Sequence, residues 1–169
     1  MPIPQPLLKG TQHDYQIGHL VDVPSPGPAV PSERRLLNLN LPPWQRPEVW
    51  THAQKRRFVE GIFLGLGCGQ YVVNGSDWEP DGQPKPMSAW LLDGQQRISA
   101  LRDFLAGDLV IFDDVSFPAL PAADQLRFKR RPFQCFELDY TNDETALMEL
   151  YDRLNFSGTP HTAEQRVLP

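Results

Sequence analysis

The stretch Leu92–Ala100, with the sequence LDGQQRISA, determines how the surrounding chain is expected to fold. It follows the apolar run Ala89–Leu92 and precedes apolar residues at helical spacing. This pattern predicts a strand at Ala89–Leu92, a tight turn at Asp93-Gly94 and a helix from Gln95 to Ala106. Gly107 follows the last helical residue and is expected to end the helix.

Polar side chains gather where this strand meets this helix, namely Asp93, Gln95, Gln96 and Arg97. A helix N-terminus presents unpaired N–H groups and the positive end of the helix dipole, and both favour phosphate. An aspartate there can hold Mg²⁺ against phosphate oxygens, while Arg97 can neutralise charge that develops during phosphoryl transfer. The two glutamines could orient a water molecule or a base edge. From the residues alone, a simple N-cap at Asp93 and a solvated Arg97 are the more common alternative.

Two further stretches accompany the central one, Leu41–Trp50 (LPPWQRPEVW) and Leu150–Glu164 (LYDRLNFSGTPHTAE). In this order, the three stretches resemble the signature blocks of the DGQQR-containing ParB/sulfiredoxin-like family. That family is known from the N-terminal halves of GmrSD-type modification-dependent restriction enzymes and from related phage-defence proteins. The resemblance runs from about Tyr15 to the C-terminus, and its most specific part is the pentapeptide DGQQR.

The resemblance implies an α+β fold, a compact ParB/sulfiredoxin-like domain with a small mixed sheet flanked by helices. We expect residues 15–169 to form this single domain, after a proline-rich and poorly ordered N-terminus at residues 1–14. With 169 residues, the chain is long enough to bury the core that one such domain needs.

Local patterns predict the remaining elements, because alternating apolar residues are typical of strands and apolar residues at helical spacing are typical of helices. The expected strands are a short one within Tyr15–Val23, followed by a helical turn, and others at Leu36–Leu41, Val72–Val73, Asp108–Phe112 and Phe133–Leu138. The expected helices are Thr51–Leu66 with Thr51 as its cap, Pro121–Arg130, and Asn142–Leu154 with Thr141 or Asn142 as its cap. A hairpin-like loop is expected at Asn74–Lys85.

The resemblance also implies a site for a nucleoside triphosphate, ATP or GTP, together with Mg²⁺. It implies that the metal ligand is Asp93 and that the catalytic residues are Asp93, Gln96 and Arg97. It implies that the nucleotide-binding residues are Gln45, Arg46, Gly94, Gln95, Arg153 and Asn155. By phosphoryl-transfer logic, Asp93 would bind Mg²⁺ or act as a base, and Arg46 and Arg97 would stabilise the transferred charge. Gln95 or Gln96 would position the nucleophile.

Three residues of the flanking stretches have structural alternatives. From the residues alone, Asn155 is more typical of a C-terminal helix cap than of a catalytic position. Trp44 and Trp50 offer flat faces that could clamp a nucleotide beside Arg46. A tryptophan pair could equally close the hydrophobic core, and that alternative suits Trp50 better than it suits Arg46.

The function implied by the resemblance is nucleotide-dependent phosphoryl transfer, by an NTPase or a kinase that acts in DNA modification or its recognition. One concrete version is a kinase that phosphorylates a hydroxymethylated base in phage DNA. Relatives that cut DNA carry a separate nuclease domain with a histidine–asparagine–histidine metal site, for which this chain has neither the length nor the histidine pattern. Two alternatives stay open: a non-catalytic DNA-binding module, and a nucleotide-sensing regulatory subunit of a restriction nuclease.

Composition constrains the partners. A net charge of −5 argues against broad, nonspecific adhesion to nucleic acid, although Lys55-Arg56-Arg57 and Lys129-Arg130-Arg131 are local basic candidates. The cysteines, Cys68 and Cys135, lack metal-ligand spacing and are expected to be reduced thiols. No apolar run approaches the roughly 20 residues that cross a bilayer. We therefore expect a cytoplasmic protein, in the host cytoplasm if a phage encodes it, with a nucleotide and DNA as partners.

Overall fold

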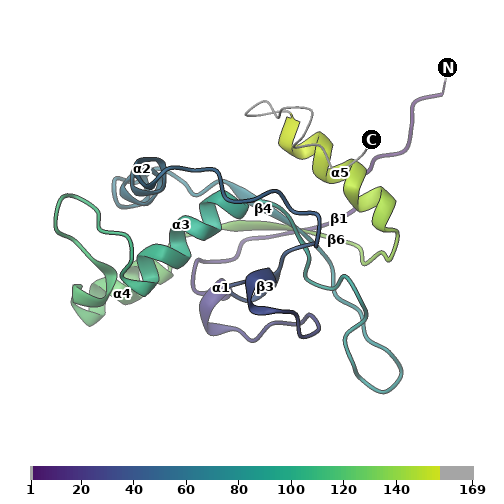
Figure 1. The fold of residues 1–169 in the computed structure, drawn as a ribbon, viewed down its shortest axis with the longest axis horizontal. Coiled ribbons are helices and arrows are strands. Elements are labelled where there is room, and N and C mark those ends of the chain that lie inside the picture. Colours follow the sequence, from purple (N-terminus) through teal and green to yellow (C-terminus); the bar gives the residue numbers. More distant parts are fainter. Residues whose placement is uncertain (1, 157–169) are drawn as a thin grey trace.

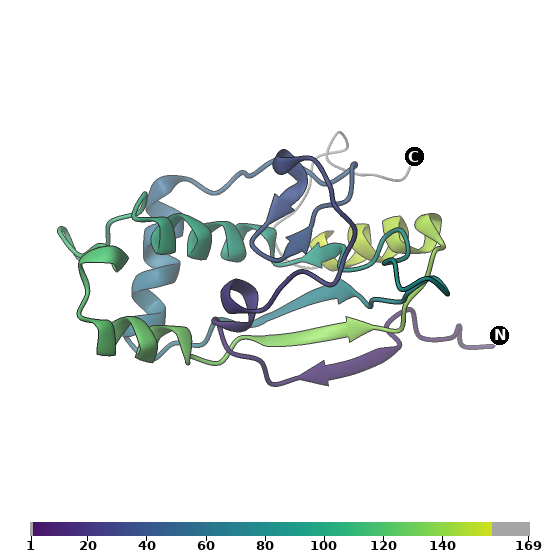
Figure 2. The same cartoon turned by 90° about the horizontal axis from the view of Figure 1, so that it is seen from below.

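The computed structural model describes residues 2–156, and its centre is a four-stranded mixed sheet (Figures 1 and 2). β4 and β6 run parallel in the middle, while β1 and β5 pair antiparallel at the two edges. Helices surround this sheet, so the structure has the α+β class that was expected. In spatial order the strands are β1 (Gly10–His13), β6 (Gln134–Leu138), β4 (Gln70–Asn74) and β5 (Leu91–Asp93).

The remaining elements are helices and one small hairpin. The hairpin pairs β2 (Arg35–Leu36) with β3 (Leu39–Asn40) in antiparallel fashion, separately from the main sheet. The α-helices are α1 (His19–Asp22), α2 (His52–Phe63), α3 (Gln95–Ala106), α4 (Ala122–Lys129) and α5 (Glu144–Phe156). Two short 3-10 turns are η1 (Ser32–Arg34) and η2 (Phe117–Ala119). No helix within residues 2–156 combines the length and the apolar character that a membrane span needs.

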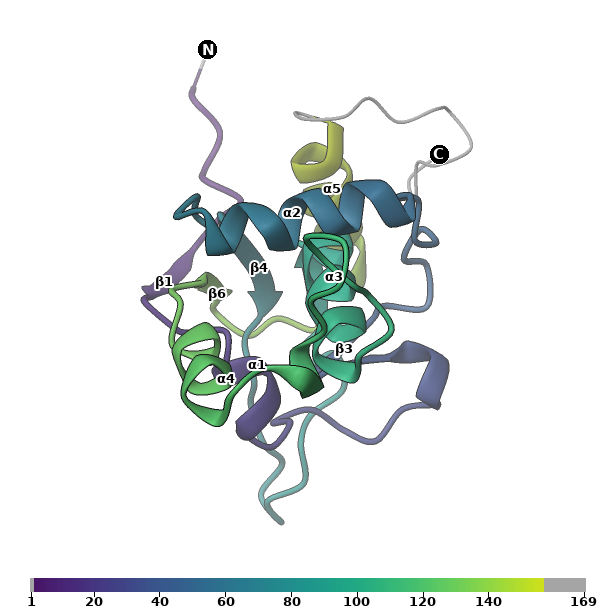
Figure 3. The ribbon, with the colours of Figure 1, turned by 90° about the vertical axis from the view of Figure 1, so that its left-hand side faces the viewer.

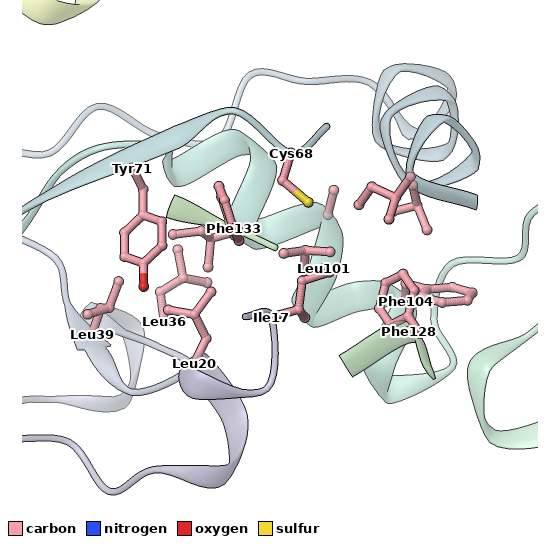
Figure 4. Close-up of a cluster of buried hydrophobic side chains, with 14 of the residues drawn as sticks. Ile17, Leu20, Leu36, Leu39, Cys68, Tyr71, Leu101, Phe104, Phe128 and Phe133 are labelled. Atoms are coloured by element: carbon pink, nitrogen blue, oxygen red, sulfur yellow. The ribbon is translucent and has the colours of Figure 1, made fainter. Parts of the chain in front are cut away.

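Different elements cover the two faces of the sheet, because successive side chains of β4 point to opposite sides. Tyr71 and Val73 pack into the larger apolar cluster, which also contains buried leucines of α1 and of the β2–β3 hairpin. Figure 4 shows the Tyr71 ring pointing toward Leu36 and Leu39. Val72 packs on the opposite face into a smaller cluster with α5, which lies over the strands in Figure 1.

Helices α2 and α3 pack against each other, as Figure 3 shows from the side of the molecule. The predicted cap of α2 is confirmed, because the Thr51 hydroxyl accepts a hydrogen bond from the Gln54 N–H at 3.2 Å and the Gln54 side chain accepts one from the Thr51 N–H. α2 ends at Phe63, earlier than the predicted Leu66. The predicted bounds of α3 are confirmed, and Gly107 ends it in the left-handed conformation with φ 86°.

Two predicted strands are wrong, and both contain residues that bend the backbone. The sequence predicts one strand at Leu36–Leu41, but the chain turns at Leu37, which has φ 53°, and so makes the β2–β3 hairpin. Asn38, the next residue of this turn, anchors it by donating to the carbonyls of His19 and Val23, which lie outside the hairpin. The predicted strand at Asp108–Phe112 is instead a turn with positive φ at Phe112 and Asp113. Its alternating apolar residues are buried individually rather than as part of a sheet.

Three smaller predictions also need correction. The poorly ordered N-terminal segment expected to reach residue 14 includes β1, whose exposed residues show no alternation because it is an edge strand held by backbone bonds to β6. Within Tyr15–Val23 the helical turn forms as α1, but the strand is reduced to one isolated bridge at Gln16. The cap of α5 is Asp143, which accepts from the Ala146 N–H at 3.1 Å, rather than Thr141 or Asn142.

Candidate functional site

The DGQQR stretch forms a tight connection between the end of β5 and the start of α3. Gly94 makes this connection possible with φ 111°, a backbone conformation that side-chain-bearing residues rarely adopt. A Cβ atom at this position would lie 2.7 Å from the Cβ atom of Tyr71 in the neighbouring strand β4. Only glycine therefore allows Asp93 and Gln95 to stand so close together at the edge of the sheet.

A pocket of about 280 Å³ opens beside this connection. It collects residues from all three stretches that the sequence singles out, although they lie far apart in the chain. Every predicted site residue lines it except Arg153, and two further residues join them. The lining residues are Gln45, Arg46, Trp50, Asp93, Gly94, Gln95, Gln96, Arg97, Leu154 and Asn155.

Arg97 is anchored at one side of the pocket by the backbone that leads into β4. Its Nη1 donates to the Cys68 carbonyl at 3.0 Å, and its Nη2 donates to the Gln70 carbonyl at 2.8 Å. Its Nη2 also lies 3.5 Å from the Asp93 Oδ2. The guanidinium is thus held in place by the fold and contributes a fixed positive charge to the pocket.

The Gln96 amide oxygen is hydrogen-bonded within the protein, whereas its amide nitrogen has no partner among the described residues. Its Oε1 accepts hydrogen bonds from the backbone N–H groups of Val49 and Trp50, at 3.0 and 3.1 Å. Because these two donors fix the amide orientation, its Nε2 must point the other way. That Nε2 is buried and has no hydrogen-bond partner among the described residues. A buried donor without a partner is costly, so this amino group favours a ligand that supplies an acceptor.

Gln45 and Gln95 extend the same polar lining. The Gln45 Nε2 donates to the Gln95 Oε1 at 3.0 Å. The Gln45 Oε1 is buried and, within the described part of the chain, has no donor. Gln95 itself is the first residue of α3, whose N-terminus has no side-chain cap. Because Gly94, Gln95 and Gln96 line the pocket, the positive end of the helix lies at its wall, an arrangement that favours an anion.

Among residues 2–156, Asp93 is the single carboxylate that lines the pocket. Burial raises the pKa of Asp93 above its usual value, and the positive charges of Arg97 and Arg46 offset this effect only in part. No cluster of three metal-ligating side chains occurs within residues 2–156. One carboxylate is nevertheless sufficient for Mg²⁺ when the substrate phosphates and water supply the other oxygens, so Asp93 fits as its protein ligand.

α5 closes the pocket through the segment that carries Leu154 and Asn155. The Asn155 Nδ2 donates to the Leu92 carbonyl at 3.3 Å, directly before Asp93, and to the Tyr151 carbonyl at 2.8 Å. Asn155 therefore ties the helix to β5 rather than simply capping it. The Tyr151 hydroxyl accepts from the Arg46 N–H at 3.2 Å, so α5 also holds the 45–50 segment.

Some residues lie elsewhere than the sequence suggested. Arg153 is exposed, pairs with Glu149 at 3.1 Å and does not line the pocket. Trp44 packs with Trp90 in the smaller core cluster instead of clamping a ligand. Leu154 was missed because it belongs to the apolar face of its helix, and only its place beside Asn155 could have indicated it. Residues 157–164 of the third stretch lie outside the described part of the chain.

The two basic triplets do not form free cationic patches. Lys55 is buried, with its Nζ 2.7 Å from the Asp103 Oδ2 and 3.2 Å from the Glu48 Oε2. Lys129 pairs with Asp22 at 3.1 Å. In both triplets the leading lysine is thus paired with a carboxylate of another segment, and only the Lys55 pair is buried.

The cysteines are not catalytic nucleophiles. Both are free and buried. Burial raises the pKa of Cys68 to about 11 and that of Cys135 to about 12, so both stay protonated at neutral pH.

Comparison with known proteins identifies the family. The model for the GmrSD restriction endonuclease N-terminal domain matches residues 31–165. This range contains all three stretches that build the pocket. Searches of curated proteins and of solved structures found no match. Because the match covers most of the chain, the protein belongs to the family of GmrSD restriction endonuclease N-terminal domains.

Proposed function

We propose that the DGQQR pocket binds the triphosphate of ATP or GTP together with Mg²⁺, and that the domain transfers or hydrolyses the γ-phosphoryl group. The observation that carries this proposal is the buried Gln96 amino group without a partner, which lies beside the uncapped N-terminus of α3. The residues that carry these side-chain and backbone donors line a pocket that also contains two arginines. A phosphate group is the common ligand that meets all of these requirements at once.

The pocket residues would share the work of phosphoryl transfer. The fixed charge of Arg97, together with Arg46, would stabilise negative charge on the transferred group. Gln96 would donate to a phosphate oxygen, and Gln45, with its unused Oε1, would orient the attacking hydroxyl group. Asp93 would hold Mg²⁺, and the bound ion would neutralise part of the phosphate charge.

The two versions of the reaction differ only in the attacking group. In hydrolysis, a water oxygen bonds to the γ-phosphorus while the bond to the β–γ bridging oxygen breaks, and the water proton passes to phosphate or solvent. In transfer, an alcohol oxygen takes the place of water and becomes a phosphate ester. For the transfer version we propose a hydroxymethylated base in DNA as the acceptor, in keeping with a family associated with restriction of DNA.

A second candidate is a nucleotide-sensing module that controls a restriction nuclease without turnover. Two motif residues favour it, because Arg97 and Gln96 already hydrogen-bond to backbone groups of other segments. In that case, the bound nucleotide would be sensed through these contacts rather than undergo chemistry. The family description is compatible with a role beside a nuclease.

One assay separates these candidates. The purified protein is incubated with Mg²⁺ and γ-labelled ATP or GTP, with and without DNA that contains hydroxymethylated pyrimidines. Label on DNA means a kinase, free phosphate means an NTPase, and binding without turnover means a sensor. Asp93→Ala should abolish product formation, whereas Asp108→Ala, at an exposed position just beyond the other end of α3, should not. Absence of both binding and turnover for the wild type would overturn the proposal.

A further inference from the structure

A second pocket, of about 250 Å³, lies on the sheet face that carries Tyr71 and Val73. It shares no lining residue with the DGQQR pocket. Segments from both halves of the chain build it, from the residues before α1 to those of β6. The lining residues that matter most are Tyr15, His19, Asn38, Tyr71, Trp78 and Glu137.

Flat rings supply much of this lining. The Tyr15 ring is stacked between the His13 ring, with centroids 4.7 Å apart, and the His19 ring, with centroids 3.7 Å apart, so these three rings form a fixed wall. Trp78 is 52% exposed at the rim. It sits on a loop that the ion pair between Lys85 and Asp77, at 2.6 Å, holds closed. A large apolar ring kept at the mouth of a pocket is suited to stacking against another flat ring.

Asn38 gives this pocket a specific polar requirement. Its side chain is mostly buried, and the residue is only 8% exposed. The Nδ2 donates to the His19 carbonyl at 2.7 Å and to the Val23 carbonyl at 3.1 Å, which fixes the orientation of the amide. The Oδ1 has no donor among residues 2–156. A buried acceptor left without a donor costs free energy, so a ligand with an N–H group would find a prepared partner here.

The other polar groups of the pocket also favour a ligand that donates hydrogen bonds. The Glu137 carboxylate accepts, and its present partner is the His13 Nε2 at 3.0 Å. Burial lowers the pKa of His19, so its ring is neutral at pH 7 and adds no positive charge. A phosphate would meet acceptors rather than cations here, unlike in the DGQQR pocket. The DGQQR pocket therefore favours an anion, whereas the second pocket favours a ligand that donates hydrogen bonds.

We propose that this second pocket binds a single nucleobase, stacked against the exposed Trp78 ring and donating an exocyclic or ring N–H group to the Asn38 Oδ1. Its volume is below the roughly 300–1,000 Å³ of pockets for drug-sized ligands, which suits one base better than a whole nucleotide. The base comes either from a free nucleoside or from an unpaired position in a DNA strand. This site is independent of the triphosphate proposed for the DGQQR pocket.

The indole N–H groups of the tryptophans can report on the two pockets separately. The chain has four tryptophans, of which Trp78 lines the second pocket and Trp50 lines the DGQQR pocket. In a ¹⁵N-labelled full chain, deoxycytidine or deoxyadenosine should shift the Trp78 indole resonance and leave that of Trp50 in place. Inorganic tripolyphosphate should do the reverse. Failure of either proposal is therefore visible without the other.

Variants at the rim test whether the ring itself binds. Trp78→Ala should weaken nucleoside binding about tenfold, in line with the loss of one stacking contact, while Trp78→Phe should retain most of it. Leu64→Ala removes another exposed apolar side chain, 70% exposed and outside the pocket, and should change nothing. Tripolyphosphate binding should be unaffected by all three substitutions.

A short single-stranded oligonucleotide identifies the source of the base. If it shifts Trp78 at lower concentration than the nucleosides do, the pocket takes its base from DNA, and if not, it takes free nucleosides. The proposal is overturned if neither ligand shifts Trp78, or if Trp78→Ala binds as tightly as the wild type.

Discussion

At the N-terminal end of α3 the Gln96 amino group is unpaired within residues 2–156, whereas toward the C-terminal end Asp103 is paired with two cations. At the N-terminal end, the helix has no side-chain cap and the Gln96 amino group has no partner among the described residues. Two turns later, Asp103 lies 2.7 Å from Lys55 and 2.8 Å from Arg102. A protein normally satisfies its buried polar groups, so the contrast separates the part of the helix that serves stability from the part at which we propose that a ligand binds.

One segment joins these two regions. Glu48 belongs to the charge network and lies 2.9 Å from Arg102 and 3.2 Å from Lys55. Its neighbours Arg46 and Trp50 line the DGQQR pocket. The ion pairs of Glu48 therefore hold the 45–50 segment in position, and this segment forms part of the DGQQR pocket.

The largest effect on stability is expected from removing a charge of the network formed by Lys55, Glu48, Asp103 and Arg102. Lys55→Ala leaves two carboxylates without their buried partner, and the free energy of unfolding should fall by about 3–5 kcal/mol. Urea unfolding measures this change. Arg57→Ala removes an exposed cation of the same helix and should stay within about 0.5 kcal/mol of the wild type. Equal losses for the two variants would mean that the network does not stabilise the fold.

The next largest effect on stability should come from Gly94, in the turn between β5 and α3 at the DGQQR pocket. Gly94→Ala introduces a strained backbone and a clash with Tyr71, at a cost of about 2–4 kcal/mol. Gly82→Ala is the matched control, because Gly82 also has positive φ but nothing within 4 Å of an added Cβ. It should cost only about 1–2 kcal/mol. Thermal unfolding gives both values, and no difference between them would remove the argument for the close approach.

A smaller effect distinguishes two carboxylates by pH. Burial raises the pKa of Asp93, so the folded state binds this proton more tightly than the unfolded chain does. The contribution of Asp93 to stability should therefore rise as pH falls through its raised pKa, while Mg²⁺-dependent tripolyphosphate binding falls. For Asp103, burial opposes ionisation, but Lys55 and Arg102 hold its pKa below the usual value. Its contribution should be present above the unfolded pKa and lost as pH falls through the lowered one.

Comparison of Asp93→Asn with Asp103→Asn across the acid range measures these opposite slopes. Asp93→Asn should stabilise the protein at neutral pH, and Asp103→Asn should destabilise it. If the free energy of unfolding changed with pH in the same direction for Asp93 and Asp103, the proposed difference between these two carboxylates would be wrong.

The smallest effect concerns Arg153. It is exposed and pairs with Glu149 on the same helix, so Arg153→Ala should change stability by no more than about 0.5 kcal/mol. It should leave tripolyphosphate affinity unchanged, because the side chain does not line the pocket. Asn155→Ala is the informative partner and should weaken binding, since Asn155 ties α5 to β5. Titration calorimetry of both variants decides whether Arg153 takes part in nucleotide binding.

Local signals explain which elements were predictable from the sequence. α3 was predicted correctly because glycines at both of its ends impose turns that depend on the backbone alone. The turn at Leu37 was not predictable, because it is held by Asn38 through carbonyls that lie 15 and 19 residues away in the chain. β1 pairs with β6, about 125 residues later, and its exposed residues contain no pattern that indicates a partner.

The candidate site was predictable from the sequence only in part. The three stretches were identifiable, but the sequence could not determine which side of α5 faces the pocket. Arg153 and Asn155 are two residues apart, which places them on different sides of a helix. The second pocket could not be predicted at all, because Tyr15, Asn38 and Trp78 come together only through the folded chain.

Tyr71 gives the two pockets a common element. Its backbone supports Gly94 at the mouth of one pocket, and its residue lines the other. Tyr71 is only 1% exposed and packs within the core, so a ligand in either pocket should leave its position unchanged. We therefore expect no thermodynamic linkage between the pockets, and neither a nucleobase nor a triphosphate should change the affinity of the other. One buried tyrosine would then hold two separate binding sites at a constant distance from each other.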